Sequence, residues 1–197
     1  MADQSVRYIG HMPRTADPGT PDRILIAVTP LFYRYGVRAV GMNQIIAAAG
    51  CGKNVLYRHF PAKTDLVAAY LRRCRADRER AAQAAESAAG DDPHARLLAL
   101  VGEVADRVRE PGFRGCAMRH HLIEFPDDED APRQIAESYL TESRARVDAL
   151  ATSPAVADRI WLLLDGLYAS AGRPDADRQA ATAVALARDL IDRSRRS

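Results

Sequence analysis

The chain has few cysteines and no long apolar run, and each absence excludes a class of protein. Its 197 residues include only three cysteines, an odd and scattered set: Cys51, Cys74 and Cys116. This usage argues against a disulfide framework and fits a reducing compartment. No apolar run is long enough to span a membrane, and the first 20 residues hold no apolar core of a signal peptide. We therefore expect a cytoplasmic protein with no membrane partner.

Acidic residues are missing from one long stretch, between Asp22 and Asp65, although the whole chain has a net charge of only +2. The same stretch holds the basic residues Arg23, Arg34, Arg38, Lys53, Arg58 and Lys63, and acids gather later, at 127–130. A basic block beside a mixed remainder indicates a polyanion partner for that block alone. A solvated basic face explains the charge equally well.

Strand signals are also missing, because no segment alternates apolar and polar residues with a period of two. Helix signals repeat instead: Thr20, Asp92 and Ser153 each stand as a capping residue before a proline. The helices so predicted cover about 20–36, 42–49, 53–59, 63–89, 92–109, 116–125, 131–151, 153–171 and 175–193, and Pro30 should kink the first. We expect an all-α fold of about nine helices after a flexible tail at residues 1–20.

Two of the predicted helices are short and meet at a turn that contains Gly50 and Gly52. Glycine permits the left-handed backbone of a tight interhelical turn, so this pair reads as a helix-turn-helix. Neither helix is stable alone, and both must therefore pack against the Leu31–Phe32 face of the preceding helix. The residues expected to face this core are Ile45, Ile46, Ala49, Leu56 and Phe60.

The other face of the second short helix carries side chains suited to a DNA major groove. Arginine can bind guanine, asparagine can bind adenine, and an apolar side chain can contact a thymine methyl group. We therefore expect base contacts from Asn54, Val55 and Arg58, and phosphate contacts from Lys53, Tyr57, His59 and Lys63. Lys63 also begins the next helix, whose first amides can face a phosphate.

The stretch from Ile24 to Leu66 resembles the DNA-binding domain of the tetracycline-repressor (TetR) family. The matching residues are Leu31-Phe32, Gly36, Ile45, Ala48-Ala49-Gly50, Lys53, Leu56-Tyr57-Arg58-His59-Phe60, Pro61-Ala62-Lys63 and Leu66. The resemblance implies a dimeric one-component regulator, most often a repressor, that binds a palindromic double-stranded DNA operator through residues 21–66. We also expect DNA contacts from Met42 and Asn43. The family usually has a hydroxyl residue near position 41 or 42, and Gly41 and Met42 replace it in this chain.

The resemblance further implies that residues 67–197 form a helical domain that dimerises, binds a small-molecule effector and needs no cofactor. A pocket requires aromatic walls and a few polar groups. We expect it between residues 93 and 171, although ordinary core packing explains each candidate taken singly. The candidates are Met118, His121, Phe125, Tyr139, Trp161, Asp165 and Tyr168. Asp165 either is a buried carboxylate that needs a partner or lies on the polar face of its helix.

Two apolar stripes in the last helices are candidates for the dimer interface, at about 154–171 and 175–193. Four such helices from two subunits can form a bundle, and a helix-turn-helix usually needs a twofold partner. The alternative is that both stripes pack inside one subunit. The stripes consist of Ile160, Leu163, Leu164, Leu167 and Ala171, and of Ala183, Val184, Ala187, Leu190 and Ile191.

Other functional interpretations have less support in the sequence. His120 and Glu124 share a helix face beside His121, but no third metal ligand is identifiable, so we expect no metal site. Cys51 fits a small buried residue better than a redox switch. An all-α enzyme lacks a nucleophile motif, a phosphate loop and a ligand set. A helical module that binds polyanions without sequence preference stays open.

Overall fold

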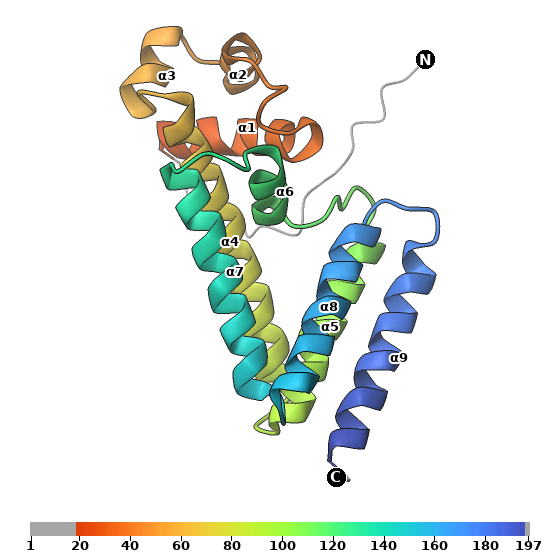
Figure 1. Ribbon diagram of the computed structural model, residues 1–197. Helices are drawn as coiled ribbons and strands as arrows, with labels where there is room; N and C mark the ends of the chain where they lie inside the picture. The colour runs from red at the N-terminus through yellow and green to blue at the C-terminus, as the bar shows by residue number, and fades with distance from the viewer. Residues whose placement is uncertain (1–18, 196–197) are drawn as a thin grey trace.

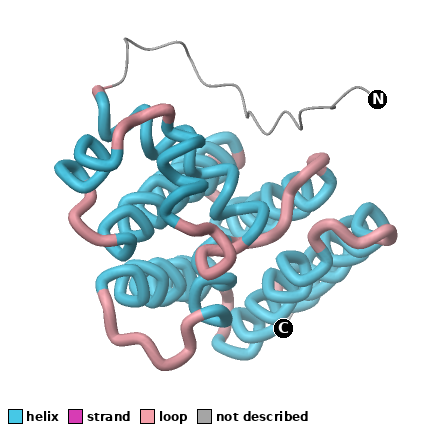
Figure 2. The backbone as a smooth tube through the Cα atoms, turned by 90° about the horizontal axis from the view of Figure 1, so that it is seen from above, coloured by secondary structure: helices cyan, strands magenta, loops and turns pink. Residues whose placement is uncertain are grey.

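The computed structural model describes residues 19–195, and this part of the chain is all-helical (Figure 2). The helices are α1 (Thr20–Tyr35), α2 (Met42–Ala49), α3 (Lys53–His59), α4 (Lys63–Ala88), α5 (Pro93–Arg109), α6 (Ala117–Glu124), α7 (Ala131–Leu150), α8 (Pro154–Ser170) and α9 (Ala176–Ser194). The all-α prediction is confirmed. The predicted tail lies outside the described residues, except for its last two positions.

The helix ends follow most of the sequence signals. The side chains of Asp92 and Ser153 each accept a hydrogen bond from an amide in the first turn of the helix that follows. The expected cap at Thr20 is wrong by one residue, because Thr20 is already helical and Gly19 takes the extended capping conformation. Helix α1 continues through Pro30 and ends at Tyr35.

Helices α1 to α3 form a head at one end of the long helix α4 (Figure 1). Helices α4 and α7 run side by side away from the head, and α5, α8 and α9 pack together beyond them. Helix α6 lies beneath the head, where it contacts both α4 and α7. We call helices α4 to α9 the body.

The buried side chains form two clusters, one of which joins the head to the body. The first, the body core, is built from α5, α8, α9 and the end of α7. The second, the head core, combines side chains of α1 to α4 with others from α6 and α7, among them Met118, Ala136 and Tyr139. Since α6 contributes to the same core as the helix-turn-helix, a movement of α6 acts directly on the head.

The two apolar stripes predicted for the dimer interface pack inside the chain. Ile160, Leu164 and Leu167 of α8 are buried in the body core, and so are Ala183, Ala187 and Ile191 of α9. The other stripe residues, Leu163, Ala171, Val184 and Leu190, are partly buried against it. The prediction that these two stripes form the dimer interface is therefore wrong. Helices α8 and α9 use these faces to pack on each other and on α5.

No helix in residues 19–195 is both long and apolar enough to cross a membrane.

Candidate functional site

The helix-turn-helix is fixed from below by fully buried aliphatic side chains. Ile45 of α2 and Leu56 of α3 have no exposed surface, and Phe60, just after α3, is 9% exposed. All three belong to the head core together with Phe32 of α1. The prediction that both short helices share a core with α1 is confirmed, with α2 packed directly on α1 and with Ile46 and Ala49 only partly buried. Because Leu56 is held in place, the rest of α3 has a defined orientation.

The turn between the short helices requires glycine at one position rather than two. Gly50 ends α2 with φ 58° and ψ 30°, a left-handed conformation that costs other residues about 1–2 kcal/mol. Gly52 has φ −70°, which any residue adopts, so the expected left-handed role at Gly52 is wrong. At the start of α2 the amide of Gly41 donates to the side chain of Gln44, at 2.8 Å.

The outward face of α3 is polar, basic and open. Lys53, Asn54, Tyr57, Arg58 and His59 are exposed, and the shorter Val55 is partly buried. The Lys53 ammonium lies 5.9 Å from the centre of the Tyr57 ring, four residues along the helix.

Three further residues predicted to contact DNA flank this face. Asn43 is exposed at the start of α2, whereas Met42 is partly buried against the head core. The Lys63 ammonium donates to the carbonyl oxygen of Val37 at 2.6 Å. Burial lowers the pKa of Lys63, and the nearby carboxylate of Glu124 opposes the shift. Lys63 therefore ties the start of α4 to the loop between α1 and α2.

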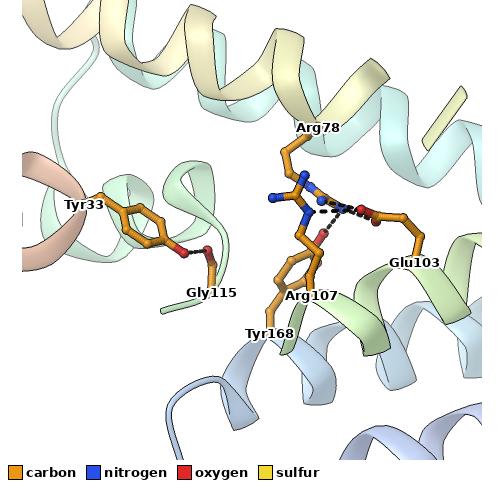
Figure 3. Close-up of polar contacts among 6 residues, drawn as sticks. All are labelled: Tyr33, Arg78, Glu103, Arg107, Gly115 and Tyr168. Carbon is orange, nitrogen blue, oxygen red and sulfur yellow. Dashed lines mark hydrogen bonds and ion pairs between the residues drawn. The ribbon is translucent and has the colours of Figure 1, made fainter. Parts of the chain in front are cut away.

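A cavity of about 70 Å³ lies in the body, among α4, α5, α6, α7 and α8. Its central feature is a buried ion pair, in which the Arg78 guanidinium of α4 donates to both carboxylate oxygens of Glu103 on α5 (Figure 3). Arg107 donates to the same carboxylate, and Arg78 also donates to the hydroxyl of Tyr168 on α8 at 3.3 Å. These contacts join α4, α5 and α8 at one point.

The ion pair keeps its charges despite burial. Burial opposes ionisation of Glu103, but hydrogen bonds from Arg78 and Arg107 hold its pKa below the usual value. Burial also opposes the charge on Arg78, yet Tyr168 and Glu103 raise its pKa overall. Burial raises the pKa of Tyr168. The cavity therefore presents a charged pair and a neutral phenol near neutral pH.

A second arginine, Arg119 of α6, lies against the aromatic wall of this cavity. Its guanidinium carbon is 5.0 Å from the centre of the Trp161 ring and 5.2 Å from that of Tyr168. It forms an ion pair with Asp165, one turn beyond Trp161 on α8. Asp165 thus has the partner that a half-buried carboxylate needs. Among the predicted pocket residues, Tyr139, Trp161 and Tyr168 line this cavity.

The structure does not place Met118, His121 and Phe125 on this cavity, because α6 turns them toward the head. Met118 is fully buried in the head core, and the His121 ring packs on Phe125 with 4.9 Å between centroids. The guanidinium of Arg38, in the loop after α1, lies 4.7 Å from the centre of the Phe125 ring. These three residues belong to the junction between head and body.

Two tethers hold the head to the body at this junction. The carboxylate of Glu124, at the end of α6, accepts hydrogen bonds from the backbone amides of Val37, at 3.0 Å, and Arg38, at 2.5 Å. The hydroxyl of Tyr33 on α1 donates to the carbonyl oxygen of Gly115 at 2.9 Å (Figure 3). It also accepts from the amide of Arg114 at 2.8 Å. Both contacts join segments more than 80 positions apart in the chain.

Gly115 connects the second tether to the cavity wall. Its φ of +102° is a left-handed conformation, and a Cβ there would lie 3.0 Å from the backbone oxygen of Tyr168. Only glycine fits this position without displacing the loop or α8. Gly115 therefore lies close to the backbone of Tyr168 on one side and binds Tyr33 of the head on the other.

A second cavity, of about 230 Å³, opens at the junction and is lined in part by His120, His121 and Glu124. His121 is only 4% exposed, and neither of its ring nitrogens has a hydrogen-bond partner among the described residues. Burial lowers the pKa of both histidines. Within residues 19–195, no three metal-ligating side chains lie together, here or elsewhere.

The cysteines lie in apolar surroundings. Burial raises the pKa of Cys74 to about 12 and also raises that of Cys116, so both remain thiols near neutral pH. Cys51 is partly buried against the head core rather than fully buried as expected.

Comparison with known proteins identifies the helix-turn-helix and the fold. Residues 24–70 match the family described as bacterial regulatory proteins, tetR family. An uncharacterised HTH-type transcriptional regulator of Mycobacterium tuberculosis is 44% identical over 52 residues, 26% of each chain. The HTH-type transcriptional activator FasR of Mycolicibacterium smegmatis is 43% identical over 51 residues, 26% of this chain and 23% of FasR. These matches span only about a quarter of the curated relatives.

The similarity to a solved structure extends over nearly the whole chain. A TetR-family transcriptional regulator from Streptomyces coelicolor superposes with a TM-score of 0.83 at 25% identity, covering 89% of this chain and 95% of that one. Residues 24–70 are thus similar to the TetR-family DNA-binding domain, and the chain shares the fold of a TetR-family regulator. These relatives are named as transcriptional regulators, the class of protein that the sequence resemblance predicts.

Several residues that build the two sites of this chain carry no signal in the sequence. Arg78 and Glu103 are ordinary charged residues in charged helical stretches, and no spacing distinguishes them from solvated neighbours. Arg119 and Tyr33 carry no signal either. The spacing of Glu124 from His120 suggests a metal ligand, whereas the contacts of Glu124 are backbone amides of the head.

Proposed function

We propose that this chain is a one-component transcriptional regulator that binds DNA through the outward face of α3. The observation that carries the proposal is the exposed basic face of α3 above a fully buried Leu56, in a stretch without acidic residues. A short helix held in this way presents its side chains to a major groove in a fixed register.

The side chains divide into those that read bases and those that bind phosphates. Asn54, Val55 and Arg58 face the base edges. Lys53, Tyr57 and His59 bind the backbone, with Met42 and Asn43 at the neighbouring start of α2. Lys63 donates one of its three N–H groups to Val37, which leaves two for a phosphate.

The salt dependence of DNA binding tests this proposal. A short duplex of arbitrary sequence should bind with an affinity that falls as salt rises, and Lys53→Ala, which removes a phosphate contact, should reduce the slope by about 0.9. The control is Arg80→Ala, an exposed arginine on α4 that pairs only with Asp77 among the described residues. Equal slopes for Lys53→Ala, Arg80→Ala and the wild type would contradict the assignment.

We propose further that the chain works as a homodimer through the outer faces of α8 and α9. Leu162 is 68% exposed and Leu186 44% exposed, although both are large and apolar. Gly166, one turn after Leu162, costs α8 about 0.5–1 kcal/mol relative to alanine. A Cβ at Gly166 would meet nothing within 4 Å, so packing inside the chain does not require glycine there. Close approach of a partner helix supplies a reason for it.

The dimer positions two recognition helices roughly 34–36 Å apart, one turn of DNA, on a palindromic operator. Leu162→Glu should produce monomers in sedimentation velocity and weaken operator binding. The matched control is Ile123→Glu, since Ile123 is 78% exposed but lies on α6. A dimer that survives Leu162→Glu unchanged would place the interface elsewhere.

The body cavity is the proposed effector site, and α6 is the proposed link to the head. Arg119 of α6 lies at the cavity and Glu124, at the end of the same helix, holds the loop after α1. An effector that displaces Arg119 therefore moves the head and favours a state that no longer fits the operator. We propose repression as the family's common mode, although one relative is named an activator.

The link has its own test in the absence of any effector. Glu124→Ala should change DNA affinity by about two- to thirty-fold, because it removes a contact that sets the head position. Glu129→Ala, an exposed carboxylate in the adjacent loop, should leave the affinity unchanged. Equal affinities for both variants would show that the head is positioned by other contacts.

A further inference from the structure

The hydrogen-bonding groups of the body cavity are unbalanced in favour of donors. Its charged lining consists of three carboxylates, Glu79, Glu103 and Glu142, and three guanidinium groups, Arg78, Arg119 and Arg146. The formal charges cancel. The carboxylates and the guanidinium groups differ, however, in how many of their hydrogen bonds are already made inside the protein. This difference determines which chemical groups a ligand needs.

Each carboxylate of the lining already has a guanidinium partner. Glu103 accepts from Arg78 and from Arg107. Glu79 and Glu142 both pair with Arg75, which does not line the cavity. A ligand that donates hydrogen bonds or carries positive charge would therefore have to share a carboxylate with an arginine, which weakens its attraction.

The guanidinium groups, in contrast, have donors to spare. The Nε atoms of Arg78 and Arg119 are buried and have no acceptor among the described residues. The Arg78 side chain is only 10% exposed, so solvent satisfies it poorly. Arg146 has a 3.4 Å contact with Glu86, a carboxylate that Arg96 holds more closely. A buried charged donor without an acceptor is costly, and a ligand acceptor relieves that cost.

The walls around these donors are flat and aromatic. The Arg119 guanidinium lies against both Trp161 and Tyr168, and Leu100 and Val104 of α5 add apolar surface. Figure 3 shows Arg78 reaching from α4 to the hydroxyl of Tyr168 on α8. A planar group can therefore stack beside the aromatic rings while its polar end reaches the arginines.

We propose that the cavity binds a small organic carboxylate with a flat apolar body, recognised by Arg119 and Arg78. The inference rests on the proposed function, in which this cavity is the effector site. The carboxylate competes with Asp165 for the terminal nitrogens of Arg119, and it reaches the buried Nε donors only where these side chains shift. Since Arg119 belongs to α6, carboxylate binding acts on the helix that ends at Glu124.

Benzoate, benzamide and benzamidine test the proposal with one ring shape and three charges. Trp161 is the only tryptophan of the chain, so its fluorescence reports the cavity directly. Benzoate should give a saturable fluorescence change and bind at least about tenfold more tightly than benzamide, because charge-assisted hydrogen bonds are lost with the amide. Benzamidine should bind more weakly than benzoate, since every carboxylate of the lining already shares its charge with an arginine.

Two variants connect the result to Arg119, with calorimetry as a second readout because both change the surroundings of Trp161. Arg119→Gln should weaken benzoate binding by about tenfold or more. Arg119→Lys keeps the charge and the ion pair but loses the planar donor, so it should bind benzoate with intermediate affinity. Arg109→Gln, an α5 arginine that pairs with Asp106 outside the cavity lining, should bind like the wild type.

Three outcomes would overturn the proposal: no benzoate response at millimolar concentration, equal affinity for benzoate and benzamide, or full benzoate affinity in Arg119→Gln. DNA binding without any probe is measured on the same samples. If the protein binds DNA but does not recognise benzoate, the proposal of a carboxylate ligand is wrong and the proposed DNA-binding function still holds. If the protein recognises benzoate but does not bind DNA, the proposed DNA-binding function is wrong and the proposed carboxylate site still holds.

Discussion

The carboxylate of Glu124 should stabilise the head through two backbone amides of the loop between α1 and α2. Glu124→Ala removes both acceptors, whereas Glu124→Gln keeps one oxygen. The comparison is informative because the two amides differ in their surroundings. Val37 is buried at 6% exposure, while Arg38 is exposed and water can replace its lost partner.

The magnitude follows from the buried amide. An unsatisfied buried donor costs about 1–3 kcal/mol, so Glu124→Ala should lower the free energy of unfolding by about that amount, mostly through Val37. Glu124→Gln should lower it by less, because its remaining oxygen can still accept from Val37. The matched control is Glu129→Ala, an exposed carboxylate for which the structure records no partner within residues 19–195.

Urea denaturation gives the unfolding free energies, and amide hydrogen exchange shows whether Val37 and Arg38 lose protection in the native state. We expect both amides to exchange faster in Glu124→Ala and to be unchanged in Glu129→Ala. An Ala variant with wild-type stability and wild-type protection at both amides would refute the reasoning.

Three further changes test the scaffold and the junction. Leu56→Ala should lower the unfolding free energy by about 2–5 kcal/mol in urea denaturation, because it empties the fully buried site beneath α3. Gly50→Ala should cost about 1–2 kcal/mol through its left-handed backbone, whereas Gly52→Ala should cost less, so equal effects would contradict the turn geometry. Burial lowers the pKa of His121 from 6.5, so below that pH the unfolded chain binds the extra proton and stability falls. His121→Leu should flatten this decline, and an unaltered pH profile would show that the decline has another origin.

The helices and the helix-turn-helix were predictable because local signals determine them. Capping residues, the glycine at position 50 and the helical spacing of apolar side chains each act within a few residues. The scaffold positions Ile45, Leu56 and Phe60 follow from the same spacing, and the structure buries all three. One end was misplaced, at Thr20, because Gly19 can take the capping conformation as well.

The cavity and the junction were not predictable in the same way, because they depend on contacts between distant segments. Arg78 meets Glu103 only because α4 and α5 pack together, and nothing separates Arg78 from the other arginines of α4 in sequence. The apolar stripe that contains Ile160 and Leu164 was also misassigned, because the sequence does not show which helix covers it. An apolar helix face predicts burial, but it does not say whether the covering helix belongs to the same chain.

The central claim, sequence-specific DNA binding by a twofold dimer, is tested most directly by selecting bound duplexes from a random DNA pool. We predict enrichment of a palindrome whose half-sites lie about one helical turn apart. Arg58→Ala should lose preference at one base position of each half-site, as expected of a base-reading arginine. A pool that yields no common sequence, despite salt-sensitive binding, would contradict the account and indicate a module that binds polyanions without reading sequence.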